Sequence, residues 1–136
     1  MATAEGAVLI VAVDRRELEG VRARCSGLER LELDLRFAAQ GSLGGRRVVL
    51  AAEGPGPRLA ARAVERAWKA GPFSAMVSTG TCGALDTALR PGDIFVATAV
   101  RCPENNAVLP ARVPAVALPH RRGVLVSVDR VVKSAA

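Results

Sequence analysis

Residues 7–13 read AVLIVAV, an unbroken apolar run that ends at Asp14. The run is much shorter than the roughly 20 apolar residues that a membrane-spanning helix needs. Continuous apolar character, rather than strict alternation, is typical of a strand that is buried on both of its faces. This segment therefore predicts a central sheet that is covered on both sides.

Strands and helices are expected to alternate along the rest of the chain. Strands are predicted at residues 31–37, 47–52, 74–79, 93–100 and 123–128, and helices from Asp14, over residues 58–70 and from Asp129. Such alternation predicts an α/β protein with a largely parallel or mixed sheet.

Local signals support several of these elements. Residues 31–37 alternate apolar and charged side chains, as a half-buried strand does. Pro57 suits the first position of a helix, and Gly71 suits its C-terminal cap. Residues 41–45 (GSLGG) predict a turn, and residues 101–122, which hold four prolines, predict a long irregular segment.

The net charge of +6 and a pI near 10.5 raise the question of nucleic-acid binding. Basic residues cluster only in pairs, and with 3% aromatic residues there is little surface on which bases could stack. We expect no nucleic-acid partner; an anionic small substrate or a solvated basic surface explains the charge equally well. No basic residue precedes the first apolar run, so no signal peptide is predicted and a cytoplasmic location is expected.

Cysteines at positions 25, 82 and 102 and the single histidine, His120, lack the short spacing of a zinc site. No metal site is therefore predicted, and the thiols are expected to be reduced.

The junction after the second buried strand, Glu53-Gly-Pro-Gly-Pro-Arg58, is one candidate site. Gly54 and Gly56 would let an anion approach backbone N–H groups at a helix start. The dinucleotide-binding pattern is incomplete because Leu59 stands where its third glycine belongs. A tight strand-to-helix turn is the structural alternative.

A second candidate is the loop Ser78-Thr-Gly-Thr-Cys-Gly83, which follows a buried strand. Ligands of open α/β sheets bind at the carboxyl ends of strands, and Thr81 would offer them a hydroxyl group. Cys82 is either a nucleophile, which would need a base, or a packing residue.

Glu17 is a third candidate. Asp14 and Glu17 have the spacing of a capping box, which would give both carboxylates a structural role. Alternatively, Glu17 faces the ligand cleft from the top of the first strand. The segment Ser127-Val-Asp129 offers the same choice between a helix cap and a pocket wall.

Taken in order, these motifs resemble the superfamily of purine nucleoside phosphorylases and methylthioadenosine/adenosylhomocysteine nucleosidases. The strongest part is residues 77–96, VSTGTCGALDTALRPGDIFV, which match the family's glycine-rich loop and its L-x-x-GD motif. Within the superfamily, the subgroup resembled is the hopanoid-associated phosphorylases.

The resemblance implies a phosphorylase-like fold, which is a three-layer αβα sandwich around a central mixed sheet. It also implies cleavage of the N-glycosidic bond of a purine, adenosyl-type nucleoside by water or phosphate, without a further cofactor. It assigns Thr81 to the attacking water or phosphate, and Glu17 to orienting the water if a one-residue gap is allowed; without the gap, Arg16 takes that position. It also assigns six residues to the substrate site: Gly54 and Gly56 to its floor near the nucleophile, Cys82 and Gly83 to the side of base and ribose, and Val131 and Val132 to the cover of the base.

Several departures accompany the resemblance. Ser78 stands where hexameric phosphorylases carry a phosphate-binding arginine, and the family's Met-Glu pair and acidic Asp would lie beyond Ala136. We therefore expect residues 1–136 to be the N-terminal portion of a longer domain, a homo-oligomer through exposed sheet edges, and inefficient as an enzyme alone. A catalytically inactive nucleoside-binding or interaction module is the main alternative, and a dinucleotide-binding reductase is a third.

Overall fold

A computed structural model describes residues 6–130 of the chain. They form two compact units, the first ending at Cys82 and the second beginning at Gly83. None of the helices within residues 6–130 is long and apolar enough to cross a membrane.

The first unit is built on a mixed five-stranded sheet with the order β2-β3-β4-β1-β5. Its strands are β1 (Ala7–Ala12), β2 (Ser26–Arg30), β3 (Phe37–Leu43), β4 (Arg46–Ala52) and β5 (Phe73–Ser78). Strand β1 runs parallel to both β4 and β5, whereas β3 is antiparallel to β2 and β4. The apolar segment that was expected to form the first strand is thus β1, which pairs in parallel with both of its neighbours.

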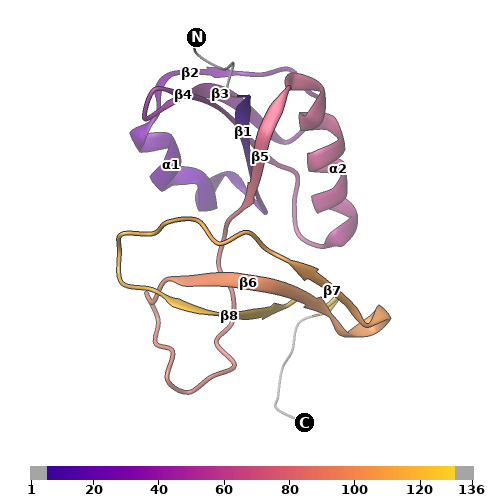
Figure 1. Cartoon of the computed structure of the whole chain (residues 1–136). Coiled ribbons are helices and arrows are strands. Elements are labelled where there is room, and N and C mark those ends of the chain that lie inside the picture. The colour runs from indigo at the N-terminus through magenta and orange to yellow at the C-terminus, as the bar shows by residue number, and fades with distance from the viewer. Residues whose placement is uncertain (1–5, 131–136) are drawn as a thin grey trace. The chain divides into compact units, whose positions relative to one another are not determined.

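Successive residues of β1 are buried on opposite faces of the sheet. Leu9 and Val11 pack with Ala63 and Ala67 of helix α2 (Pro57–Ala67), while Ile10 packs on the other face. That second face is closed by the 3-10 helix η1 (Arg15–Leu18), through Leu18, and by α1 (Glu19–Arg24). Helices α1 and α2 lie on opposite sides of the sheet (Figure 1), which confirms the predicted three-layer arrangement.

The helix signals of the sequence are confirmed in the structure. The Asp14 side chain caps η1, and Pro57 occupies the first turn of α2. A short 3-10 helix, η2 (Trp68–Ala70), extends α2, and Gly71 is its C-terminal cap.

The strand predicted at residues 31–37 is wrong. Strand β2 ends at Arg30, β3 starts at Phe37, and a loop connects them. The leucines of the loop do pack against the core on the α2 side, so the alternation reflects burial without a hydrogen-bonded ladder. Asp34 has a φ of 52°, which breaks the extended backbone, and its carboxylate pairs with Arg62 and Arg66 of α2.

The predicted turn at residues 41–45 is shorter than expected. Strand β3 continues to Leu43, and the reversal is made by Gly44 and Gly45, with φ values of 58° and 79°. Two consecutive residues of positive φ are what a tight hairpin requires, and glycine adopts that backbone without strain.

The second unit has a three-stranded sheet with the order β7-β6-β8. Its elements are β6 (Phe95–Cys102), a 3-10 helix η3 (Pro103–Asn105), β7 (Ala107–Pro110) and β8 (Arg121–Val126). Strand β6 is antiparallel to β7 and parallel to β8.

The irregular segment expected at residues 101–122 is therefore only partly irregular, since η3 and β7 make a hairpin with β6. Asn106 has a φ of 55° at its reversal. Asp129 and Arg130 form a bend; the rest of the predicted C-terminal helix lies outside the described residues.

Candidate active site

The three parallel strands of the first unit bring the predicted loops to one edge of the sheet. Because β1, β4 and β5 run in the same direction, their carboxyl ends lie at the same edge. The segments that follow them are Val13–Asp14, the Glu53–Gly56 junction and the loop that contains Thr81. This is the position at which open α/β sheets bind ligands.

Glu17 and Thr81 are brought into direct contact. Glu17 Oε1 accepts hydrogen bonds from the Thr81 backbone N–H and from the Thr81 hydroxyl, both at 3.2 Å. Glu17 Oε2 accepts a third hydrogen bond, from the Val13 N–H at 3.0 Å. One carboxylate thus connects the end of β1 with the loop after β5.

A glycine makes this contact possible. A Cβ added at Gly80 would lie 2.8 Å from Glu17 Oε2 and 3.0 Å from Glu17 Cδ, which is closer than van der Waals contact. The loop glycine next to Thr81 therefore provides the space that the Glu17 carboxylate occupies.

The capping box is only half formed. Asp14 Oδ1 accepts from the N–H groups of Arg16 and Glu17, at 2.7 and 3.3 Å, as predicted for an N-cap. Glu17 instead spans from Val13 to Thr81. Glu17 thus lies at the carboxyl ends of β1 and β5, and its role in a ligand cleft stays a prediction.

The junction after β4 contains a buried carboxylate that sequence reasoning did not single out. Glu53 is 8% exposed; its Oε2 accepts from the Arg36 N–H at 3.0 Å, and its Oε1 pairs with Arg62 Nε at 3.4 Å. The charge is thus compensated inside the fold, and the start of β3 is tied to the end of β4. Burial of an acidic residue is not visible in the sequence, because it depends on strands that are distant along the chain.

Gly54 and Gly56 both adopt backbone conformations that favour glycine. Their φ values are 134° and 94°, and Gly56 is the N-cap residue of α2. A Cβ at Gly54 would lie 2.8 Å from Leu59 Cδ1. The tight-turn interpretation of this junction is therefore correct, and it is compatible with a binding role.

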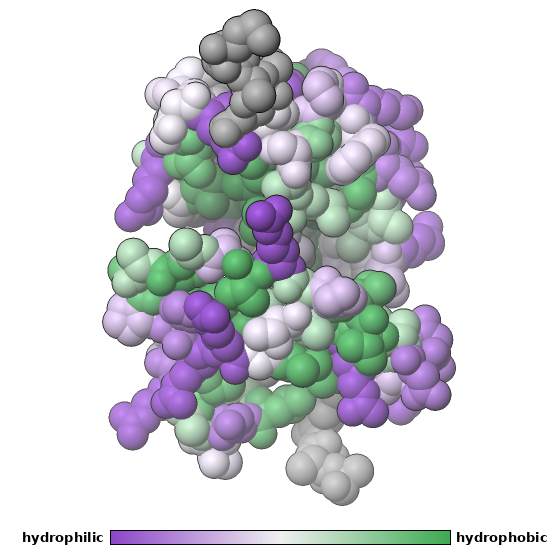
Figure 2. All heavy atoms as spheres, in the orientation of Figure 1, coloured by the Kyte–Doolittle hydropathy of each residue, from purple (hydrophilic) through white to green (hydrophobic). Residues whose placement is uncertain are grey.

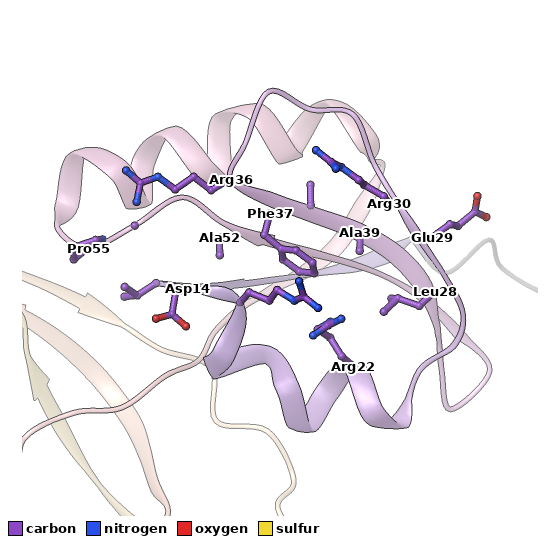
Figure 3. Close-up of a pocket in the computed structure, with 14 residues that line it drawn as sticks. Asp14, Arg22, Leu28, Glu29, Arg30, Arg36, Phe37, Ala39, Ala52 and Pro55 are labelled. Carbon is purple, nitrogen blue, oxygen red and sulfur yellow. The ribbon is translucent and has the colours of Figure 1, made fainter.

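A pocket of about 740 Å³ opens beside this junction, on the α1 side of the sheet. Its lining combines apolar residues with arginines (Figure 3). The lining residues are Val13, Asp14, Arg15, Arg22, Leu28, Glu29, Arg30, Arg36, Phe37, Ala38, Ala39, Ala52, Gly54 and Pro55.

Phe37 organises two of the arginines. The guanidinium carbons of Arg15 and Arg22 lie 5.9 and 5.4 Å from the centroid of its ring, within cation–π range. Sequence reasoning missed this cluster, because its members come from η1, α1 and the start of β3. The Arg15–Arg16 pair was the only local signal.

Two further predicted site residues, Cys82 and Gly83, follow Thr81 directly in the chain. Cys82 is exposed and has a free thiol, and Gly83 is the first residue of the second unit. Val131 and Val132 lie outside the described residues. Within residues 6–130, no group of three or more His, Cys, Asp or Glu side chains could hold a metal ion.

The fold defines an α/β protein in which the candidate site lies at the carboxyl ends of parallel strands. A family model described as the phosphorylase superfamily matches residues 7–120, and the chain therefore belongs to that superfamily. The superfamily proposed from the motifs is thus confirmed. A search of curated proteins found no match.

Solved structures of nucleosidases share the fold. The 5′-methylthioadenosine/S-adenosylhomocysteine nucleosidase of Neisseria meningitidis, in complex with methylthio-immucillin-A, aligns with a TM-score of 0.71 at 22% identity, over 91% of this chain and 65% of that one. The S-adenosylhomocysteine nucleosidase of Streptococcus pyogenes, in complex with 5-methylthiotubericidin, gives 0.74 at 17% identity, over 96% and 66%.

The chain spans about two thirds of the length of these nucleosidases. The expectation that residues 1–136 are the N-terminal portion of a longer domain stays a prediction, as does the hopanoid-associated subgroup.

Proposed function

We propose that this chain functions in the hydrolytic cleavage of the N-glycosidic bond of a purine nucleoside, with water as the nucleophile. The observation that carries the proposal is the hydrogen-bonded pair of Glu17 and Thr81 at the ends of β1 and β5. Membership of the phosphorylase superfamily and the fold shared with nucleosidases support the same chemistry.

In the proposed reaction, water held by Glu17 and Thr81 attacks the anomeric carbon of the ribose. The water proton passes to the Glu17 carboxylate, and the electrons of the glycosidic bond go to the purine nitrogen, which must be protonated by another acid. Positive charge builds up on the sugar in the transition state, and the negative carboxylate stabilises it. No cofactor is needed for these steps.

The position of Glu17 favours water over phosphate. A carboxylate hydrogen-bonded to the Thr81 hydroxyl would repel a phosphate anion bound at the same group. Ser78, at the place of the family's phosphate-binding arginine, adds no compensating positive charge. We accordingly assign the nucleophile-positioning role to Glu17 and not to Arg16.

The binding residues are proposed from the resemblance. Gly54 and Gly56 would form the floor near the nucleophile, Cys82 and Gly83 would lie beside base and ribose, and residues 131–132 would cover the base.

The exposed apolar side chains of edge strand β5, Met76 at 51% and Val77 at 45%, support a homo-oligomer. Apolar residues reach the surface in both units (Figure 2). We also propose a cytoplasmic location for the protein.

Release of adenine from adenosine and from 5′-methylthioadenosine, with and without phosphate, tests the function. It should be measured on this chain and on any longer polypeptide from the same reading frame. We expect release without phosphate, slow for this chain, and a loss of at least about 100-fold on Glu17→Gln. Glu65→Gln, an exposed carboxylate on α2, is the control.

Release that requires phosphate would contradict the assignment of water. No release by either polypeptide, combined with measurable nucleoside binding, would establish the alternative of an inactive binding module.

A further inference from the structure

The pocket beside β3 carries an excess of positive charge. Four arginines line it (Arg15, Arg22, Arg30 and Arg36), against the two carboxylates of Asp14 and Glu29. The Asp14 carboxylate is already engaged, because its Oδ1 accepts the N–H groups that begin η1. Arginine is the side chain that best matches the geometry of phosphate and carboxylate groups.

Two of these arginines, Arg15 and Arg36, are available to a ligand, whereas the other two pair with carboxylates. Arg22 pairs with Glu19 at 3.2 Å, and Arg30 pairs with Glu32 at 3.3 Å. By contrast, neither Arg15 nor Arg36 pairs with a carboxylate anywhere in residues 6–130. Arg36 is held in place through its backbone N–H, which donates to the buried Glu53 carboxylate.

The floor of the pocket strengthens an interaction with an anion. Ala38, Ala39 and Ala52 are buried residues of β3 and β4, and Phe37 lies next to them. Apolar walls lower the local dielectric, so that a guanidinium group attracts an anion more strongly there than in open solvent.

The pocket is continuous with the candidate active site. Val13, whose N–H is bound by Glu17 Oε2, lines it together with Asp14 and Gly54. In Figure 3, Asp14 and Pro55 lie at one end of the pocket and Leu28 and Glu29 at the other. A nucleoside that reacts beside Glu17 can therefore extend a substituent into the pocket.

We infer that the pocket binds an anionic 5′ substituent, a phosphate group carried by the nucleoside itself. This inference rests on the proposed function and specifies its substrate class. Arg15 and Arg36 are the groups that recognise the anion, and the apolar floor contacts the part of the substituent that connects it to the ribose.

Calorimetric titration of the whole chain tests the inference with five probes: adenosine, 5′-methylthioadenosine, adenosine 5′-monophosphate, adenosine 5′-diphosphate and inorganic phosphate. We expect at least one of the two 5′-phosphates to bind about tenfold or more tightly than adenosine and methylthioadenosine. The variant R15Q/R36Q should lose this gain and keep its affinity for adenosine. Arg24→Gln, which removes one positive charge from α1 outside the pocket, should retain the gain.

A measurement on the unchanged protein avoids any dependence on the fold of the variants. Raising KCl from about 50 to about 500 mM should weaken binding of the 5′-phosphates severalfold and leave adenosine unaffected, since salt screens charge interactions.

The outcomes separate the inference from the proposed function. Adenosine binding with no gain for either 5′-phosphate overturns the inference alone, as does tighter binding of methylthioadenosine, which would assign the pocket to an apolar substituent. If inorganic phosphate binds and 5′-phosphates gain nothing over adenosine, the pocket holds free phosphate and the inference is overturned. Failure of every nucleoside probe to bind overturns both.

Discussion

The Glu17 carboxylate and the Thr81 hydroxyl lie 3.2 Å apart, although 64 residues separate them in the sequence. Each follows a different strand, and both strands are parallel neighbours in one sheet. The pair provides a proton acceptor and a hydroxyl group at the same place. That combination is what positioning a water molecule for attack requires.

Thr81 variants should separate its hydroxyl from its backbone. Thr81→Val removes the donor to Glu17 Oε1 but keeps the N–H bond, so we expect a loss of about tenfold or more in adenine release. Thr81→Ser keeps the hydroxyl and should lose less than about threefold. Rates for both variants, measured on the polypeptide that shows activity, check this. Equal losses in the two variants would contradict a specific role for the hydroxyl, and a loss in Thr81→Ser alone would assign the effect to the methyl group.

Gly80→Ala should displace the Glu17 carboxylate, because the added Cβ would lie 2.8 Å from Oε2. We expect a loss of unfolding free energy of about 1 kcal/mol from the weakened hydrogen bonds, together with lower activity. Gly20→Ala in α1 is the control, since its Cβ would meet nothing within 4 Å. Thermal unfolding compares the two; a Gly80→Ala variant as stable and active as the parent would show that the loop accommodates the methyl group.

Gly54→Ala should destabilise the first unit by about 1–3 kcal/mol for two reasons, a φ of 134° and a clash with Leu59 Cδ1. The reasons can be separated in the background Leu59→Ala, where the clash is absent and only the backbone strain remains. Urea unfolding of the four proteins of this double-mutant cycle measures the coupling. A cost that is unchanged in the Leu59→Ala background would attribute the whole effect to the backbone.

Glu53→Gln should lower the free energy of unfolding by about 1–3 kcal/mol. The substitution removes the buried negative charge, and so weakens the hydrogen bond from the Arg36 N–H and the ion pair with Arg62. Asp34→Asn removes a carboxylate that also pairs with Arg62, but whose side chain is 77% exposed. We expect that variant to cost less than about 1 kcal/mol. Chemical denaturation ranks the two, and the reverse order would mean that burial does not decide the cost.

Much of the fold could be predicted because its signals are local. The apolar run that forms β1, the Asp14 cap and Pro57 at the start of α2 each act within a few residues. The loop after β2 could not be predicted. Alternation of apolar and charged side chains indicates that one side of a segment is buried, but a strand also needs a neighbouring strand to which its backbone can hydrogen-bond. In this loop, Asp34 has a positive φ that interrupts the extended backbone, and the Asp34 carboxylate pairs with Arg62 of α2.

The candidate site divides in the same way. The sequence alone determined which residues carry useful chemistry: the carboxylate of Glu17, the hydroxyl of Thr81 and the glycines at positions 54 and 56. Only the tertiary structure decided that Glu17 contacts Thr81, that Glu53 is buried, and that arginines gather around Phe37. These facts follow from the order and direction of the strands, because hydrogen bonds and burial depend on neighbours in space that the chain brings together only when the sheet forms.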